Sequence, residues 1–255
     1  MTALLQVQGV SKSFGGLRAV QDVSLTVTQG SLTALIGPNG AGKTTLFALM
    51  SGFLRPDQGN VSFAGQDITG QAPHLNAALG LTRTFQIVQP FAAQTVRENI
   101  AVGAHLHLPQ RALALARAEE VALQVGLSSQ LDKLASDLTV AGRKRLEMAR
   151  ALAARPKLLL LDEVLAGLNP QEIAEMIPVV RNLVAQGVTV LMIEHVMQAV
   201  MSLAQEVWVL AQGQLIAHGS PAEVTNNPAV VEAYLGHGTA ERLRKSAAPA
   251  REVSE

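Results

Sequence analysis

The chain has 255 residues, and 48% of them are hydrophobic, which is enough to bury the core of one large domain or two small ones. Its formal net charge is zero, so it has no excess of basic residues for binding a nucleic-acid backbone, and DNA or RNA binding is not expected. The absence of cysteine excludes disulfides, thiolate catalysis and cysteine-ligated metal sites.

The first ten residues have neither a basic segment nor a sustained apolar stretch, so we expect no signal or transit peptide. The longest strongly apolar runs, at residues 158–161 and 188–193, are far shorter than the roughly 20 residues that a membrane-spanning helix needs. Any role at a membrane should therefore depend on partner subunits.

Short stretches of alternating apolar residues fill the region from residue 5 to residue 36, and glycine-containing turns such as Gly15-Gly16 separate them. This pattern predicts half-buried β-strands joined by tight turns. Residues 32–36 are the last of these strands, a glycine-rich loop follows at 37–42, and residues 43–50 indicate a helix. The order is therefore strand, glycine loop, helix.

The glycine-rich loop fits a known phosphate-binding pattern. Residues 37–44 match G-x-x-x-x-G-K-[ST] in the strand, loop and helix context that this pattern requires. Glycines let the backbone wrap a phosphate, while amide N–H groups and the positive end of the helix face the anion. Lys43 would neutralise the terminal phosphates, and the Thr44 hydroxyl would coordinate Mg²⁺. The predicted nucleotide-binding residues of the loop are Gly37, Pro38, Asn39, Gly40, Ala41, Gly42, Lys43, Thr44 and Thr45.

The middle of the chain indicates both strand and helix. Residues 59–63 suggest a strand that continues through a turn at 65–67 into a second one. Residues 112–125 are rich in alanine, leucine, glutamate and arginine, all of which favour helices. We therefore expect the region beyond this second strand pair to be largely helical.

Two continuous apolar runs, at residues 158–161 and 188–193, are typical of parallel strands covered on both faces. Residues 171–186 between them have the length of a crossover helix. Pro178 lies inside this helix and should remove one of its hydrogen bonds. Strand, helix and parallel strand together indicate an α/β sheet.

Two adjacent carboxylates, Asp162 and Glu163, follow the apolar run at 158–161. The buried strand would fix their place, and its carboxyl end would expose them beside the phosphate loop. Asp162 would organise Mg²⁺ through its waters, and Glu163 would polarise the water that attacks the terminal phosphate. A solvated strand end could also carry two acids, but the phosphate loop favours the catalytic interpretation.

Near the end of the chain, apolar segments at 207–210 and 215–217 flank Gln212-Gly213, which predicts a hairpin. Residues 238–255 are small or charged and nearly devoid of large apolar side chains. Such a segment buries too little surface to offset its ordering entropy, so we expect a disordered tail.

Taken together, these segments resemble an ABC ATPase over nearly the whole chain, from Leu4 to about Gly238. The resemblance implies an α/β fold with a P-loop NTPase (RecA-like) core at residues 4–87 and 154–237. It also implies an N-terminal antiparallel β subdomain, an inserted helical subdomain at residues 88–153, and ATP and Mg²⁺ as ligands.

Three further residues match positions that have a role in this family. Phe14 matches the aromatic residue that stacks on adenine, and Gln86, after Thr84-Phe85, matches the Q-loop glutamine at the Mg²⁺ site. His195, after Ile193-Glu194, matches the switch histidine that contacts the γ-phosphate. The resemblance thus implies a catalytic set of Lys43, Gln86, Glu163 and His195. Core packing for Phe14 and solvent exposure for Gln86 and His195 are the ordinary alternatives.

The segment at residues 138–152 matches the family signature L-S-G-G-Q and the helix after it, but it departs from the pattern. Thr139 keeps a hydroxyl, Val140 and Ala141 replace the two glycines, and Gly142 replaces the glutamine. Each added Cβ narrows the approach of the backbone to a nucleotide held by the opposing subunit. We therefore expect a heterodimer with a more regular second ATPase subunit, a homodimer being the alternative, and slower hydrolysis at the site that receives this segment.

A finer resemblance, to the branched-chain amino acid group of bacterial uptake transporters, is carried by residues 10–20, 83–86, 163–170 and 219–236. It implies an ATPase subunit of an importer for branched-chain or related amino acids, peripheral to the cytoplasmic face of the bacterial inner membrane. The implied partners are a second ATPase subunit, transmembrane permeases and, indirectly, a periplasmic binding protein. Relatives of this group import urea, amides or aromatic acids, so the chain does not reveal its substrate.

Three other functions compete with this interpretation. A non-transport ABC protein of DNA repair, chromosome organisation or translation would be expected to carry long coiled coils, zinc cysteines, duplicated cassettes or basic patches. A GTPase or small-molecule kinase would leave the order of Gln86, the signature and His195 unexplained. A non-catalytic nucleotide-sensing subunit fits the altered signature, whereas Glu163 and His195 argue against it.

Overall fold

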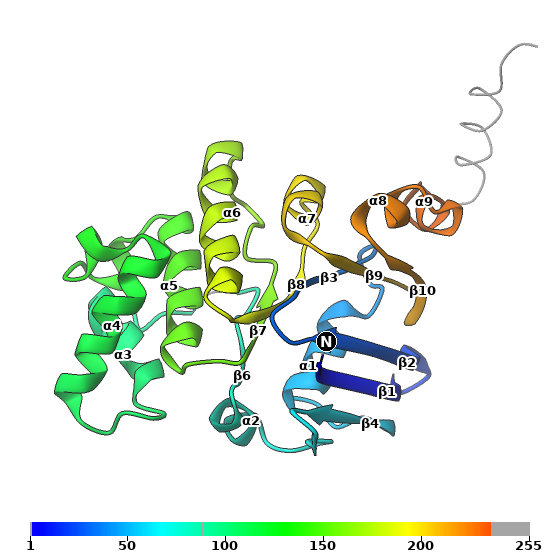
Figure 1. Cartoon of the computed structure of the whole chain (residues 1–255), viewed down its shortest axis with the longest axis horizontal. Coiled ribbons are helices and arrows are strands. Elements are labelled where there is room, and N and C mark those ends of the chain that lie inside the picture. Colours follow the sequence, from blue (N-terminus) through cyan, green and yellow to red (C-terminus); the bar gives the residue numbers. More distant parts are fainter. Residues whose placement is uncertain (1, 88, 236–255) are drawn as a thin grey trace, which may run out of the picture.

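Two β-sheets organise the molecule, described here for residues 2–87 and 89–235 of a computed structural model (Figure 1). The predicted boundary at residue 237 and the predicted tail at 238–255 lie outside the described residues. In spatial order the larger sheet consists of β10 (Gln214–Gly219), β9 (Glu206–Ala211), β3 (Leu32–Ile36), β8 (Thr189–Ile193), β7 (Leu158–Asp162) and β6 (Leu81–Arg83). The smaller sheet consists of β2 (Leu17–Thr28), β1 (Ala3–Phe14), β4 (Gln58–Phe63) and β5 (Gln66–Asp67).

The larger sheet is parallel from β9 to β6, and only β10 runs antiparallel, after the predicted turn at Gln212-Gly213. Its central strands are buried on both faces, as the continuous apolar runs predict. In β7, Leu158 and Leu160 belong to one hydrophobic core, while Leu159 and Leu161 belong to the other. This alternation explains why a four-leucine run forms a strand here, since every residue of the run is covered.

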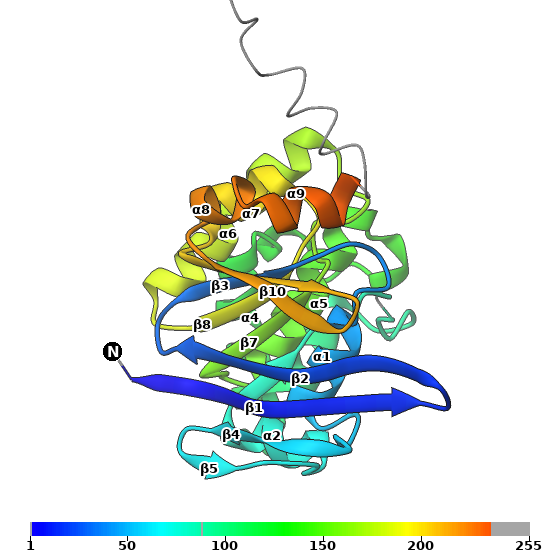
Figure 2. The same cartoon turned by 90° about the vertical axis from the view of Figure 1, so that its right-hand side faces the viewer.

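The smaller sheet is antiparallel and lies on one side of the larger one (Figure 2). The predicted alternation is confirmed, because Val23, Leu25 and Val27 of β2 are buried. They share a core with helix α1 (Lys43–Ser51) and with one face of the larger sheet. The turn predicted at 65–67 is wrong by about two residues, because Gln66 and Asp67 already pair with β4 as strand β5.

Helices cover the opposite face of the larger sheet and extend it at one end (Figure 1). Between β6 and β7 the chain forms α3, α4 and α5, which pack on one another as a helical insertion. Helix α4 confirms the helix predicted at 112–125. The remaining bounds are α2 (Pro73–Leu79), α3 (Val96–Ala104), α4 (Arg111–Val125), two 3₁₀ turns (Ser128–Gln130 and Ala135–Asp137), α5 (Val140–Ala153), α6 (Pro170–Ala185), α7 (Met197–Leu203), α8 (Pro221–Thr225) and α9 (Pro228–Leu235).

Helix α6 is the predicted crossover helix, and it continues through Pro178. The proline removes the hydrogen bond to the carbonyl of Ala174. Both residues are exposed, so water can solvate the freed carbonyl and the helix is not interrupted. Of the helices in the described part of the chain, none has the length and apolar character needed to span a bilayer.

Candidate functional site

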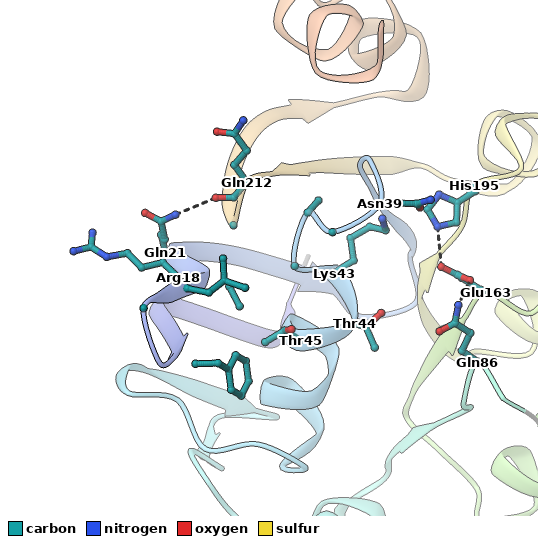
Figure 3. A pocket seen from close by; sticks show the side chains of 18 residues that line it. Arg18, Gln21, Asn39, Lys43, Thr44, Thr45, Gln86, Glu163, His195 and Gln212 are labelled. Atoms are coloured by element: carbon teal, nitrogen blue, oxygen red, sulfur yellow. Dashed lines mark hydrogen bonds and ion pairs between the residues drawn. The ribbon is translucent and has the colours of Figure 1, made fainter. Parts of the chain in front are cut away.

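A pocket of about 1220 Å³ opens where the first hairpin meets the carboxyl ends of the parallel strands. It is lined by the loop after β3, by residues that follow β7 and β8, and by the end of β1. Eleven of the predicted site residues line it together: Phe14, Asn39, Gly40, Ala41, Gly42, Lys43, Thr44, Thr45, Gln86, Glu163 and His195. Figure 3 shows Lys43, Thr44 and Thr45 on one side of this pocket and His195, Glu163 and Gln86 on the other. Parallel strands place their following loops at one edge of the sheet, which explains the convergence.

The loop at residues 37–42 contains two glycines, Gly37 and Gly42, that no other residue could replace without a collision. Gly37 has φ +152°, and a Cβ there would lie 1.9 Å from the carbonyl oxygen of Leu210. Gly42 has φ +105°, and a Cβ there would lie 2.3 Å from the carbonyl oxygen of Ala19. Helix α1 begins directly afterwards, at Lys43. The loop therefore presents its amides and the positive end of a nine-residue helix to the pocket.

Lys43 is buried by this loop, with only 5% of its surface exposed. Its ammonium donates hydrogen bonds to the carbonyl oxygens of Gly37 at 2.7 Å and Pro38 at 3.0 Å. Burial lowers the pKa of Lys43, and the negative charges of Glu163 and Asp162 oppose this shift. A cation held in this way is positioned before any anion binds, so little side-chain entropy remains to be lost on binding.

Glu163 lies at the centre of the polar group opposite the loop. Its carboxylate accepts a hydrogen bond of 2.6 Å from Gln86 Nε2 and contacts His195 Nε2 at 2.7 Å (Figure 3). Its backbone has φ +50°, in the left-handed region that costs a non-glycine residue about 1–2 kcal/mol. Strain of this kind occurs where surrounding structure fixes a side chain for function.

Asp162 precedes Glu163 but is fully buried, and its main partner is a residue to which the sequence pattern assigned no role. Arg83 Nη2 donates to Asp162 Oδ2 at 2.6 Å, and both side chains are more than 90% buried. Burial raises the pKa of Asp162, whereas the hydrogen bond and charge of Arg83 lower it. The guanidinium also lies 5.4 Å from the ring centroid of Phe85 and 5.7 Å from that of Phe47.

The residues predicted for Mg²⁺ are compatible with such an ion. Thr44, Gln86 and Asp162 line one hollow beside the main pocket. Asp162 Oδ1 is buried and has no hydrogen-bond partner among the described residues, so an acceptor is left over where a metal-bound water could donate. Within the described ranges no cluster of three acidic or histidine side chains is available to hold a cation alone. An ion here would therefore need oxygen atoms from a bound phosphate, as Mg²⁺ commonly does.

Glu194 is a second buried acid that the sequence pattern did not single out. It is 1% exposed, and its Oε1 accepts a hydrogen bond of 3.0 Å from the Leu165 amide. The backbone amide of His195 also donates to it. Burial raises the pKa of Glu194 to about 7. Its side chain thereby ties the segment after β7 to the segment after β8.

The end of the pocket at Phe14 also contains residues to which the sequence assigned no role. The Phe14 ring is 47% exposed and lines the pocket, so it is available for stacking. Gly213, in the turn between β9 and β10, donates its amide to the Ala41 carbonyl at 2.9 Å and accepts from the Gln21 amide at 2.8 Å. This turn therefore braces the phosphate loop against the first hairpin. A generic hairpin turn carries no signal from which this contact could be predicted.

The signature segment does not line this pocket. Thr139 caps helix α5, and its hydroxyl accepts a hydrogen bond from the Gly142 amide at 3.1 Å. Val140 opens the helix and is 54% exposed, so its side chain faces away from the core. Residues 139–142 are therefore separate from the pocket of their own chain, and Thr139 and Val140 at the start of the segment are exposed.

Two family models match the chain: "ABC transporter" over residues 20–166 and "Branched-chain amino acid ATP-binding cassette transporter" over residues 214–240. Among similar proteins is the high-affinity branched-chain amino acid transport ATP-binding protein BraF of Pseudomonas aeruginosa, 39% identical over 91% of this chain and 98% of the relative. The corresponding protein LivG of Salmonella typhimurium is also 39% identical, with the same coverage.

Solved structures of ATP-binding cassettes have the same fold as this chain. A nucleotide-free ATP-binding cassette from an ABC transporter superposes with a TM-score of 0.85 at 32% identity, covering 92% of this chain and all of that one. The ADP conformation of MJ1267, an ATP-binding cassette of an ABC transporter, gives 0.84 at 33% identity with the same coverage. The predicted α/β class with an ATP-binding cassette fold is thus confirmed.

Proposed function

The chain belongs to the ABC transporter family of ATP-binding cassettes, and on this premise we propose that it is the ATP-hydrolysing subunit of an importer for branched-chain or related amino acids. The observation that carries the proposal is the pocket in which Lys43 faces the group formed by Gln86, Glu163 and His195. The second family model and the named relatives support the substrate class over DNA repair or translation. The names of those relatives, which describe transport ATP-binding proteins, support our further proposal that the chain is peripheral to the cytoplasmic face of the bacterial inner membrane.

ATP would bind with its base on Phe14 and its phosphates in the loop at residues 37–45. The amides at the start of α1 and the Lys43 ammonium would neutralise the β- and γ-phosphates, since both are already oriented toward the pocket. When bound, Mg²⁺ supplies charge neutralisation at the phosphate oxygens. Thr44, Gln86 and Asp162 are the residues that would hold it, with Asp162 acting through water.

Glu163 would act on the attacking water. A carboxylate in a partly enclosed site can accept a proton from water while the phosphate charge is stabilised around it. Gln86 and His195 would exchange their present hydrogen bonds to Glu163 for contacts with the water and the γ-phosphate. Both side chains already lie within hydrogen-bond distance of the carboxylate, so only small movements are required.

Residues 139–142 would face the nucleotide of the opposing subunit in a head-to-tail dimer. The exposure of Thr139 and Val140 at the start of α5 supports this role, and the side chains of Val140 and Ala141 would limit how closely the backbone approaches that nucleotide. We therefore propose a heterodimer with a more regular ATPase subunit, in which the site receiving this segment hydrolyses ATP more slowly.

Permease subunits would dock on the helical subdomain proposed for residues 88–153. A groove of about 340 Å³ lies between its helices and the core, and the exposed side chains of Phe53, Phe85, Val102 and Leu106 line it. An amphipathic helix placed in such a groove buries its apolar face, which is a common mode of helix recognition. Phe85 lines the groove and directly precedes Gln86, so a helix bound in the groove would shift the position of Gln86 in the catalytic site.

The proposal is tested on the chain purified with the second ATPase subunit, the permeases and the binding protein. We expect ATP turnover that rises when the binding protein carries leucine, isoleucine or valine, and that Glu163→Gln abolishes. Absence of turnover would remove the ATPase assignment. Turnover that responds to another ligand class, such as urea, would retain the ATPase and overturn the substrate class.

A further inference from the structure

Lys144 is a buried cation on the helix that carries the signature segment. It lies in the second turn of α5, two residues after Gly142, and only 7% of its surface is exposed. Its ammonium donates to the carbonyl oxygen of Glu163 at 2.9 Å and to that of Gln86 at 3.4 Å. One side chain from the helical insertion thus holds the backbone of two catalytic residues.

The peptide that Lys144 holds is under strain. Glu163 adopts a left-handed backbone, its amide donates to the Ile193 carbonyl, and its own carbonyl also accepts from the Ala166 amide at 3.2 Å. The direction of the carboxylate depends on this backbone conformation. A charged donor on the carbonyl stabilises the conformation more strongly than a neutral donor would.

The surroundings of Lys144 also explain why a charge is tolerated there. Burying an ammonium group is unfavourable unless hydrogen-bond acceptors and nearby negative charges compensate it. Lys144 lies close enough to Asp162, Glu194 and Glu147 to act on all three carboxyl groups. An apolar side chain would fill the same space without the cost of dehydration, so the cation is there for its hydrogen bonds.

We propose that Lys144 is a positioning residue. It couples the position of α5, the helix that carries the signature segment, to the position of the Glu163 carboxylate in the same chain. The inference rests on the proposed function, in which residues 139–142 contact the nucleotide of the opposing subunit. Movement of α5 on that nucleotide would be transmitted through Lys144 to Glu163 and Gln86. The two ATP sites of a dimer would thereby be coupled through one buried hydrogen-bonding side chain.

The test compares Lys144→Met, Lys144→Arg and the matched control Arg145→Met. Arg145 is the next residue of α5, and it also bridges the insertion to the core, through Glu175 of α6 at 3.3 Å. Within the insertion it donates to the Val125 carbonyl of α4 at 3.0 Å. These two hydrogen bonds of the Arg145 side chain do not reach the backbone of Gln86 or Glu163. A general loosening of α5 should therefore affect both positions, whereas loss of the proposed link should affect only Lys144.

Turnover is measured on the transporter complex, and hydrogen exchange on the full chain. Lys144→Met should lower kcat roughly 10- to 100-fold, as expected for loss of a charged hydrogen bond, while KM for ATP changes less than about twofold. The Ala166 amide, which shares the Glu163 carbonyl, should exchange about tenfold faster. Lys144→Arg should restore most of kcat, and Arg145→Met should leave kcat and Ala166 exchange unchanged.

Unchanged kcat and exchange in Lys144→Met, or equal losses in Lys144→Met and Arg145→Met, would overturn the inference. If Lys144→Met does not fold, Lys144→Gln replaces it. That variant keeps an N–H donor on a shorter side chain, so kcat should fall at least about threefold, and no fall would overturn the inference. Glu163→Gln is the reference: if it retains turnover, the proposed function fails, whereas if it alone loses turnover, only the role of Lys144 fails.

Discussion

The phosphate pocket and the signature segment would both contact ATP, yet they are built in opposite ways. In the pocket, Lys43 is 5% exposed and hydrogen-bonded, and Glu163 has partners on both carboxylate oxygens. In the signature segment, Val140 is 54% exposed and the Thr139 hydroxyl serves only to cap α5. The first region is organised within the chain, while the second must be completed by another molecule.

This difference explains which departures from the family pattern the chain can tolerate. A Cβ at Gly37 or Gly42 would collide with the chain's own backbone, so a change there would disturb the fold as well as the site. Val140 and Ala141 sit in the first turn of a helix, where their side chains meet no such obstacle in this chain. Their side chains should therefore reduce ATP hydrolysis only when a partner subunit brings its nucleotide against this segment.

The sharpest test of the organised region is Glu163→Gln. The amide has the same shape but cannot accept a proton from water, so turnover should fall roughly 100- to 10,000-fold, as expected for loss of a general base. ATP affinity should change little, because the phosphate loop is untouched. Turnover of the transporter complex and binding of a fluorescent ATP analogue measure the two effects. Wild-type turnover in this variant would remove Glu163 from its role.

Lys43→Ala tests the opposite side of the pocket, where the expected effect is on ATP binding. Removing its charged hydrogen bonds should weaken ATP binding by about 1.5–3 kcal/mol, or roughly 10- to 100-fold in Kd. Isothermal titration with Mg-ATP measures the change. Lys157 is an exposed lysine just before β7, and Lys157→Ala is the matched control that should bind like wild type. Equal affinity in both variants would contradict the phosphate-loop assignment.

Glu194→Gln tests how tightly the segments after β7 and β8 are tied together. The folded state raises the pKa of this carboxyl from 4.5 to about 7, so between these pH values it binds more protons than the unfolded state does. Glu194 should therefore lower stability as pH rises through this window, by up to roughly 3 kcal/mol. Glutamine keeps an acceptor for the amides of Leu165 and His195 and does not titrate. Denaturant unfolding at pH 5 and pH 8 should show the variant gaining stability relative to wild type at the higher pH, and parallel profiles would be inconsistent with this account.

The smallest effect in the isolated chain should come from Val140→Gly with Ala141→Gly, which restores the two signature glycines. Glycine in the first turn of α5 should reduce the free energy of unfolding by about 1 kcal/mol at Ala141 and by less at Val140, because valine is itself a weaker helix former than alanine. ATP affinity of the isolated chain should not change, because these residues do not line its pocket. In the transporter complex, turnover should rise, since the backbone can approach the opposing nucleotide more closely. A changed ATP affinity in the isolated chain would contradict the claim that the signature segment does not contribute to the nucleotide pocket of its own chain.

Local patterns were sufficient for much of the fold and the site. The glycines at 37–42 and the acids after residues 158–161 have chemistry and strand context within a few residues, so their meeting at one sheet edge could be predicted. The ion pair of Arg83 could not be predicted in this way, because its partner Asp162 lies 79 positions away and no residue near Arg83 in the sequence indicates an ion pair. Lys144 was also missed, because the carbonyl groups that it binds are present in every sequence. Such contacts depend on how the insertion packs on the core.

The central claim is that the backbone of residues 37–45 holds the terminal phosphates of ATP within reach of the side chain at position 163. A crystal structure of the Glu163→Gln chain with ATP and Mg²⁺ tests it most directly. We predict the β- and γ-phosphates against the loop amides and the Lys43 ammonium, with the γ-phosphate facing position 163. Phosphates bound elsewhere, or a γ-phosphate turned away from that position, would contradict the account.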